Sequence, residues 1–123
     1  MTEWVDRDDL DALRDLAMIE PGSEGVRDEG LIHGALMRPI NRSLYEVADL
    51  AELASCYLYG LAKAHGFVNG NKRTAWLAAR LFLAMNGVEL VATPGDVVEL
   101  VRGVASGALS ELGCARWLRE RGV

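Results

Sequence analysis

Hydrophobic residues recur along the chain every three or four positions, the spacing that lets a helix bury one face. Over residues 46–64 they form one stripe, whereas residues 71–85 are apolar almost all round, which suits a helix enclosed by others. Further helices are predicted over 8–19, from 94 to about 105, and from 110 to about 119. The pattern therefore predicts an all-α bundle around two central helices.

Glycine, proline and polar residues mark the predicted connections. They gather over residues 21–28 and 38–43, so both stretches are expected to be loops. Between them, residues 30–37 can form a short helix. Pro39 is expected to end it, because proline lacks a backbone donor and disfavours helix at the preceding residue. Residues 88–92 are expected to be briefly extended.

The composition is that of an ordinary globular protein. The chain has 123 residues, of which 50% are hydrophobic and 25% charged, and we expect a single domain over 1–123. The acidic N-terminus lacks the pattern of a secretory signal, and no apolar run approaches the ~20 residues that span a bilayer. These features predict a cytoplasmic protein without a membrane partner. Cys56 and Cys114 are expected to be buried free thiols.

One polar segment, residues 65–74, joins the two most apolar helices. The net charge of −5 argues against a surface that tracks nucleic acid, although a local cluster of cations could still bind one nucleotide. Gly70 lets the backbone approach a ligand closely, and the helix that follows presents unpaired N–H groups to an anion. Lys72 and Arg73 add a compact charge and a bidentate fork, which both suit phosphate. The segment therefore predicts a phosphate-binding loop.

The same segment holds a candidate general base. His65 is a candidate because a histidine side chain can accept a proton from a hydroxyl held beside the phosphates, whereas Phe67 is expected to pack into the core and anchor the loop. Any one of these residues could belong to an ordinary capped, solvated helix end. Their combination favours a site. The other histidine, His33, is expected to be an ordinary helix residue, because two histidines without Cys or carboxylate partners make a weak metal site.

The sequence of residues 65–73, HGFVNGNKR, resembles the Fic superfamily signature in its Doc (death-on-curing) form, H-x-F-x-[D/N]-[G/A]-N-K-R. The similarity extends further, since residues 27–39 resemble the family's segment before the active site. Residues 86–88 and 103–107 resemble its later landmarks. The resemblance covers most of the chain and implies a Fic-like helical bundle with the active-site loop between its central helices.

The resemblance also implies roles for the loop residues. His65 would be the general base for the target hydroxyl. Four residues would hold the phosphates of ATP: Gly70, Asn71, Lys72 and Arg73. Asn69 stands where most Fic proteins have a magnesium-binding Asp or Glu. A neutral amide still offers a carbonyl oxygen, but it lacks the charge that favours Mg²⁺.

Lys72 stands where typical Fic enzymes, most of which transfer AMP, have glycine. The Doc lysine is associated with an inverted nucleotide and transfer of the terminal phosphate. The resemblance thus implies a kinase that acts on a serine or threonine hydroxyl, with elongation factor Tu as the family precedent and growth arrest as the outcome. AMP transfer by the same residues is an alternative. A second alternative is a catalytically weak module that binds a nucleotide or partner, in which Asn69 abolishes useful magnesium binding.

Fic proteins that restrain themselves carry a Ser/Thr-x-x-x-Glu-Gly/Asn helix, and this chain contains no such string. The resemblance therefore implies an antitoxin protein, whose flexible segment folds as a helix into a groove of the toxin. Three charged residues are expected either to line the target-binding edge of the site or to be merely solvated: Arg27, Asp28 and Arg38.

Overall fold

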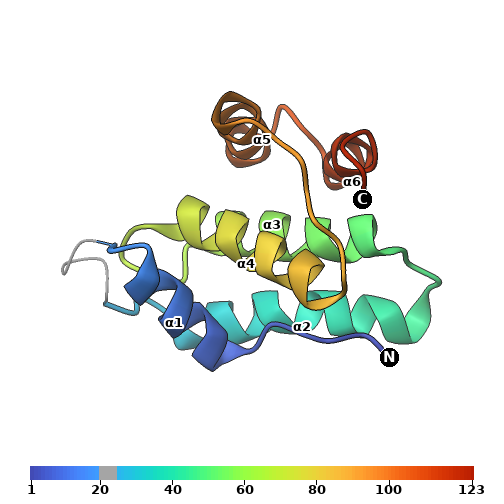
Figure 1. Ribbon diagram of the computed structural model, residues 1–123. Helices are drawn as coiled ribbons and strands as arrows, with labels where there is room; N and C mark the ends of the chain where they lie inside the picture. The colour runs from blue at the N-terminus through green and yellow to red at the C-terminus, as the bar shows by residue number, and fades with distance from the viewer. Residues whose placement is uncertain (20–24) are drawn as a thin grey trace.

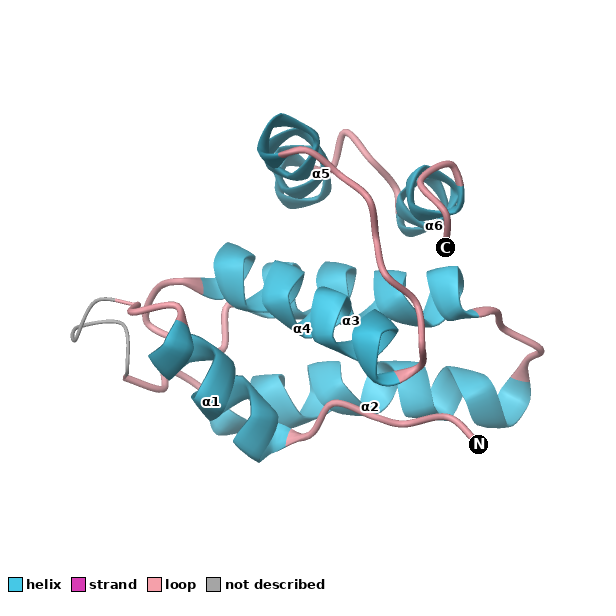
Figure 2. Cartoon of the chain, in the orientation of Figure 1, coloured by secondary structure: helices cyan, strands magenta, loops and turns pink. Residues whose placement is uncertain are grey.

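The computed structural model describes residues 1–19 and 25–123. Over these residues the regular structure is helical, with one isolated antiparallel bridge between Val26 and Phe67 (Figure 2). The helices are α1 (Arg7–Leu16), α2 (Glu29–Tyr45), α3 (Leu50–Ala64), α4 (Asn71–Met85), α5 (Pro94–Ser106) and α6 (Glu111–Arg119). The predicted all-α fold is confirmed.

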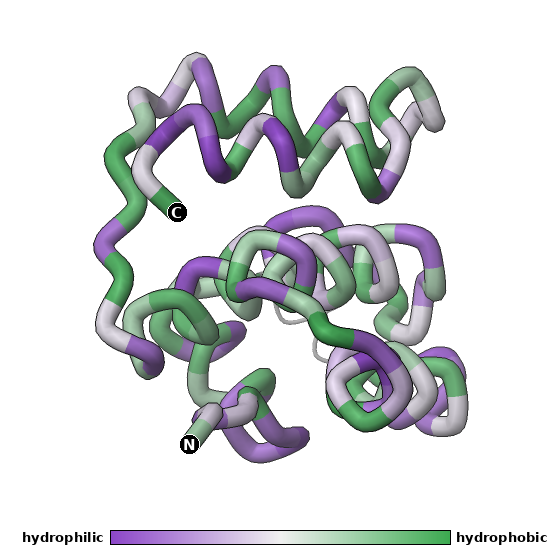
Figure 3. The backbone as a smooth tube through the Cα atoms, turned by 90° about the vertical axis from the view of Figure 1, so that its right-hand side faces the viewer, coloured by the Kyte–Doolittle hydropathy of each residue, from purple (hydrophilic) through white to green (hydrophobic). Residues whose placement is uncertain are grey.

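The helices lie in three layers, with α3 and α4 in the middle (Figure 1). On one side of this pair lie α1 and α2, and on the other side lie α5 and α6. Figure 1 shows α5 and α6 nearly end-on while α2, α3 and α4 run across the view, so the third layer crosses the middle one steeply. The side view in Figure 3 shows the same crossing and the long connection from α4 to α5. The α3–α4 loop thereby lies at one edge of the molecule, beside the end of α1.

The core is centred on the contact between α3 and α4. Small buried residues, among them Ala54 and Ala78, let the two helices lie close together. The rings of Tyr57 and Phe82 then meet across the contact in a tilted arrangement, with their centroids 5.1 Å apart and their planes at 44°. The Tyr57 hydroxyl accepts a hydrogen bond from the Val5 backbone N–H at 3.0 Å, and burial raises the pKa of Tyr57 to about 12. The tyrosine stays neutral and ties the N-terminal segment to the central helices.

The predicted end of the second helix is wrong. Helix α2 continues through Pro39 to Tyr45, so the predicted loop over 38–43 is helical. Proline removes a backbone hydrogen bond and by itself favours a break. Pro39 is buried, however, and Arg38 and Arg42 donate hydrogen bonds to acids of other helices at 2.6 and 2.7 Å. These tertiary contacts outweigh the local preference.

Two other predicted boundaries are also wrong, for local reasons. Helix α3 begins at Leu50 rather than at residue 46, because Asp49 forms a capping box with Glu52. Residue 46 instead ends α2. Helix α1 ends at Leu16 rather than at residue 19, and Met18 then adopts a positive φ of 53°.

The remaining helices follow the prediction. Helix α4 begins and ends at the predicted residues, α6 ends at Arg119 as predicted, and α5 extends one residue beyond the predicted 105. Residues 88–92 form an irregular connection rather than a strand. Of the loop predicted over 21–28, residues 21–24 lie outside the described residues.

Both cysteines are buried and free, as predicted. Burial raises the pKa of Cys56, and it raises the pKa of Cys114 to about 11. No helix in the described part of the chain is long and apolar enough to cross a membrane.

Candidate active site

The C-cap of helix α3 is His65, whose backbone adopts the left-handed conformation (φ 51°, ψ 42°). This conformation is uncommon for a residue that carries a side chain, and it turns the chain out of the helix. The exposed His65 lines a cavity of about 700 Å³ together with Lys72 of α4 and Arg102 of α5. The predicted base therefore faces a space within the range of small-molecule sites, about 300 to 1,000 Å³.

The segment before α2 fixes the backbone around His65. The Gly66 carbonyl accepts hydrogen bonds from the backbone N–H groups of Arg27, at 2.8 Å, and Asp28, at 3.0 Å. The Arg27 Nε also donates to the His65 carbonyl at 2.7 Å. A Cβ at Gly66 would overlap Ile32 of α2, so position 66 accepts only glycine without rearrangement. These contacts set the direction in which the chain leaves α3.

Asn71 holds the loop in its folded shape. Its side-chain oxygen accepts a hydrogen bond from the Phe67 N–H, and its side-chain nitrogen donates to the Phe67 carbonyl, both at 3.0 Å. Phe67 is 3% exposed, which confirms its predicted place in the core. Because the Asn71 amide is engaged in this way, the group of Asn71 best placed for a phosphate is its backbone N–H.

Sequence reasoning missed Arg14, a buried residue of α1 that contacts the same loop. Its guanidinium lies 3.8 Å from the centroid of the Phe67 ring and donates to the Asn69 carbonyl at 3.2 Å and the Thr74 hydroxyl at 3.0 Å. The sequence spacing could have indicated that Arg14 is buried, because Arg14 lies four positions after the buried Leu10 and so shares its helix face. Arg14 therefore ties α1 to the loop.

The N-cap of helix α4 is Gly70 (φ 75°), which has no side chain to cap the helix. In the other described helices the N-cap side chain accepts a hydrogen bond from the first turn: Asp6, Asp28, Asp49, Thr93 and Ser110. The first-turn N–H groups of α4 lack such an acceptor, and they lie at the positive end of the helix dipole. This end of α4 is suited to bind an anion.

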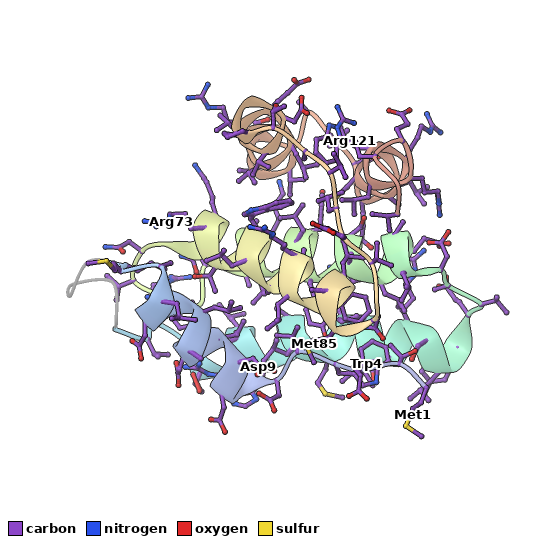
Figure 4. The ribbon with its side chains drawn as sticks, in the orientation of Figure 1. Met1, Trp4, Asp9, Arg73, Met85 and Arg121 are labelled. Atoms are coloured by element: carbon purple, nitrogen blue, oxygen red, sulfur yellow. The ribbon has the colours of Figure 1, made fainter. Side chains whose placement is uncertain are left out.

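The two predicted cations stand at this helix start. The Arg73 guanidinium donates to the Ala17 carbonyl at 2.9 Å, and Figure 4 shows Arg73 at the start of α4, near the end of α1. Lys72 lines the cavity that holds His65, and both cations line an adjoining cavity of about 260 Å³ between α4 and α5. No Asp or Glu is among the described residues that line either cavity. The structure thus brings His65 and Lys72 to one positively charged space.

The residues present do not fit a magnesium ion held by the protein. Asn69 is exposed and neutral, and the Arg14 guanidinium adds a positive charge 3.2 Å from the backbone carbonyl of Asn69. No group of three or more His, Cys, Asp or Glu in residues 1–19 and 25–123 could hold a metal ion. His33 is an exposed helix residue beside Glu29, at 3.6 Å.

The residues predicted at the target-binding edge separate into two places. Arg27 lies beside His65, and the Asp28 side chain caps α2. Arg38 instead donates to Glu111 at 2.6 Å and lines a different cavity, with Asn41 and Arg42 among its neighbours. The structure thus brings Arg27 and Asp28 to the loop, but not Arg38.

A histidine at the end of one helix, an uncapped start of the next and cations around one cavity define a helical protein with a candidate anion-binding site beside a histidine. The chain belongs to the Fic/DOC family, whose model matches residues 4–83. The Toxin Doc of Mycolicibacterium smegmatis is 43% identical over 95 residues, which cover 75% of this chain and 71% of that protein. The Protein kinase doc of Escherichia phage P1 is 35% identical over 118 residues, which cover 94% of this chain and 93% of that protein. The predicted family and the prediction of an enzyme of this family are confirmed.

Proposed function

We propose that this chain is a toxin that transfers the terminal phosphate of ATP to a serine or threonine hydroxyl of a target protein. The observation that carries this proposal is that His65 and Lys72 line one cavity, at the uncapped start of α4. The relative named Protein kinase doc, which aligns over 94% of this chain, supports a kinase. Lys72 supports it further, since it offers a mobile cation where a glycine would leave only backbone.

The proposed reaction is a single phosphoryl transfer. His65 accepts the proton of the target hydroxyl as the hydroxyl oxygen bonds to the terminal phosphorus. The bond from this phosphorus to the bridging oxygen breaks, and ADP leaves with that electron pair. Lys72, Arg73 and the first-turn N–H groups of α4 stabilise the charge on the phosphate oxygens. The Arg27 contact holds the His65 backbone during this step.

The proposed partners are a target and an antitoxin. The family precedent for the target is elongation factor Tu, and modification of a threonine on this factor would arrest translation in the cytoplasm. The relative named Toxin Doc supports a toxin, and hence an antitoxin whose flexible segment folds on the toxin as a helix. If so, a small protein encoded beside this chain should restore growth when the two are expressed together, and toxicity that no such protein relieves would contradict this partner.

The test of the transfer uses the purified chain, purified elongation factor Tu and ATP labelled at either the terminal or the alpha phosphate. We expect label from the terminal phosphate alone, and mass spectrometry should show the addition of one phosphoryl group. Label from the alpha phosphate would show AMP transfer and overturn the kinase. ATP binding without transfer to this factor or to proteins of a cell lysate would favour the binding module.

A further inference from the structure

Helix α5 forms the far wall of the candidate active site. Together with α4 it lines the cavity of about 260 Å³, called here the α4–α5 cleft, whose apolar lining is Trp76, Val97, Val98 and Val101. Lys72 and Arg102 line both this cleft and the cavity that holds His65, so the two spaces adjoin. Although the chain carries a net charge of −5, the charged residues described in these two linings are all cations.

We propose that the α4–α5 cleft binds the purine base of the nucleotide and that Arg102 binds its phosphate chain. This inference rests on the proposed function and adds two things to it, a site for the base and a residue of α5 that contacts substrate. Sequence reasoning selected neither Arg102 nor Trp76, because neither residue belongs to the loop. Trp76 lies four positions after Lys72 on α4, and Arg102 comes near the loop only through the packing of α5 beside α4.

The order of residues along the two spaces gives the nucleotide a direction. His65 lies in one space, Lys72 and Arg102 lie at the boundary, and Trp76 lies in the other. A nucleotide with its base beside Trp76 would cross the two cations with its phosphate chain and bring its terminal phosphate to His65. The reverse direction would place the base near His65, where the other lining residues are small, such as Ala62 and Gly103. The apolar cleft thus favours transfer of the terminal phosphate.

The size and chemistry of the α4–α5 cleft fit a base better than a whole ligand or a protein segment. Its volume of about 260 Å³ is below the usual range of small-molecule sites, about 300 to 1,000 Å³, so it suits one part of a ligand that continues into the larger space. Bases stack on aromatic side chains, and Trp76 supplies one beside three valines. The cations at the boundary match an anionic tail attached to that base.

The test compares calorimetric titrations of ATP and of inorganic tripolyphosphate, which has the phosphates without the base. Trp76→Leu removes the aromatic face, and Val98→Trp fills the cleft from a side chain that is 49% exposed and so leaves the fold intact. We expect each variant to bind ATP about tenfold more weakly and tripolyphosphate within about twofold of the original chain. Val91→Trp, at a residue that is 77% exposed and outside the cleft, should change neither affinity.

Arg102 is tested by Arg102→Gln, with Arg116→Gln of α6 as the matched control for loss of one exposed charge. Because Arg102 is assigned to the phosphates, this variant should bind both ATP and tripolyphosphate about tenfold more weakly. Arg116→Gln should leave both affinities within about twofold.

Three results would overturn the inference. Equal affinity of the original chain for ATP and tripolyphosphate would remove the base site while leaving the phosphate site standing. Unchanged ATP affinity in Val98→Trp would also remove the base site. If Val98→Trp kept its ATP affinity but bound the antitoxin or the target more weakly, the α4–α5 cleft would be a docking site for a protein. If neither ATP nor tripolyphosphate binds, the proposed function fails together with this inference.

Discussion

The two ends of α3 are built in opposite ways. At its start, Asp49 caps the helix, and Arg119 donates to Asp49 at 2.9 Å and to Glu52 at 3.2 Å. Arg42 donates to the other Glu52 oxygen at 2.7 Å. At its end, the helix stops at a left-handed His65, and α4 then begins without a side-chain cap.

The two ends of α3 therefore have different expected roles, one in the stability of the fold and the other in the proposed reaction. Burial opposes the ionisation of Asp49, yet hydrogen bonds from Arg119 and from backbone N–H groups hold its pKa below the usual value. The polar groups at this end thus satisfy one another. At the His65 end, the proposed function instead assigns Lys72 and the first-turn N–H groups of α4 to substrate binding. Substitutions at the Asp49 end should therefore change stability, and substitutions at the His65 end should change activity.

The largest effect is expected from loss of the base. His65→Asn removes it but keeps a side chain that tolerates the left-handed backbone, so the fold should stay intact. Phosphate transfer should fall by about a hundredfold or more, because a positioned base contributes that much. Single-turnover transfer measures the rate, and thermal unfolding checks the fold. Transfer at the original rate by this folded variant would remove His65 from the mechanism.

A smaller loss of transfer is expected from changes at Lys72. Lys72→Gly should reduce transfer of the terminal phosphate at least about tenfold, and any remaining product should shift toward AMP transfer. Lys72→Gln keeps much of the stem without the charge. It should lose rate but keep the terminal phosphate as the transferred group, as mass spectrometry of the target would show. A Lys72→Gly variant that transfers phosphate at full rate would show that this lysine has no part in the reaction.

Gly66→Ala should affect both stability and activity, because the added methyl group strains the loop beside His65. The added Cβ would overlap Ile32, and overpacking of this kind costs roughly 1–3 kcal/mol in the free energy of unfolding. Gly34→Ala is the matched control in α2, where the Cβ would meet nothing within 4 Å. It should stabilise the chain by roughly 0.5–1 kcal/mol. Urea unfolding measures both, and equal effects of the two variants would show that position 66 is not crowded.

The smallest effect is expected at the Asp49 end. Because the folded state lowers the pKa of Asp49, its contribution is present above the unfolded pKa of about 3.9 and is lost as the pH falls through the folded pKa. Asp49→Asn should therefore destabilise the chain at about pH 7, by less than about 1 kcal/mol for so exposed a pair, and the difference should shrink as the pH falls through the folded pKa of Asp49. Phosphate transfer should not change. A stability difference independent of pH would contradict this assignment.

Features that depend on neighbouring residues in sequence could be predicted. The start of α4 after Gly70 and its end before Asn86 were predicted correctly, because glycine and asparagine act on the adjacent backbone. The passage of α2 through Pro39 could not be predicted, since it depends on contacts such as Arg38 with Glu111, 73 residues away.

The same distinction applies to the site. The spacing of residues 65–73 predicted its loop. The contact of Arg14 with Phe67 depends on how α1 packs against the loop, and the role proposed for Arg102 depends on how α5 packs beside α4. Hydrophobic spacing says which face of a helix is buried, but not which distant helix it meets.

The backbone at Gly70 also limits how this protein can be made more heat-resistant. An N-cap side chain usually stabilises a helix by about 1 kcal/mol, so replacing Gly70 with a capping residue would be expected to stabilise the start of α4. The left-handed φ of 75° and the side chain of Ile19, 3.1 Å from where a Cβ would lie, make any replacement there strained. Directed evolution for thermal tolerance should therefore collect its gains elsewhere, as on exposed helix faces. The Gly70 turn, to which the proposed function assigns phosphate binding, would survive such a screen even if activity were never selected.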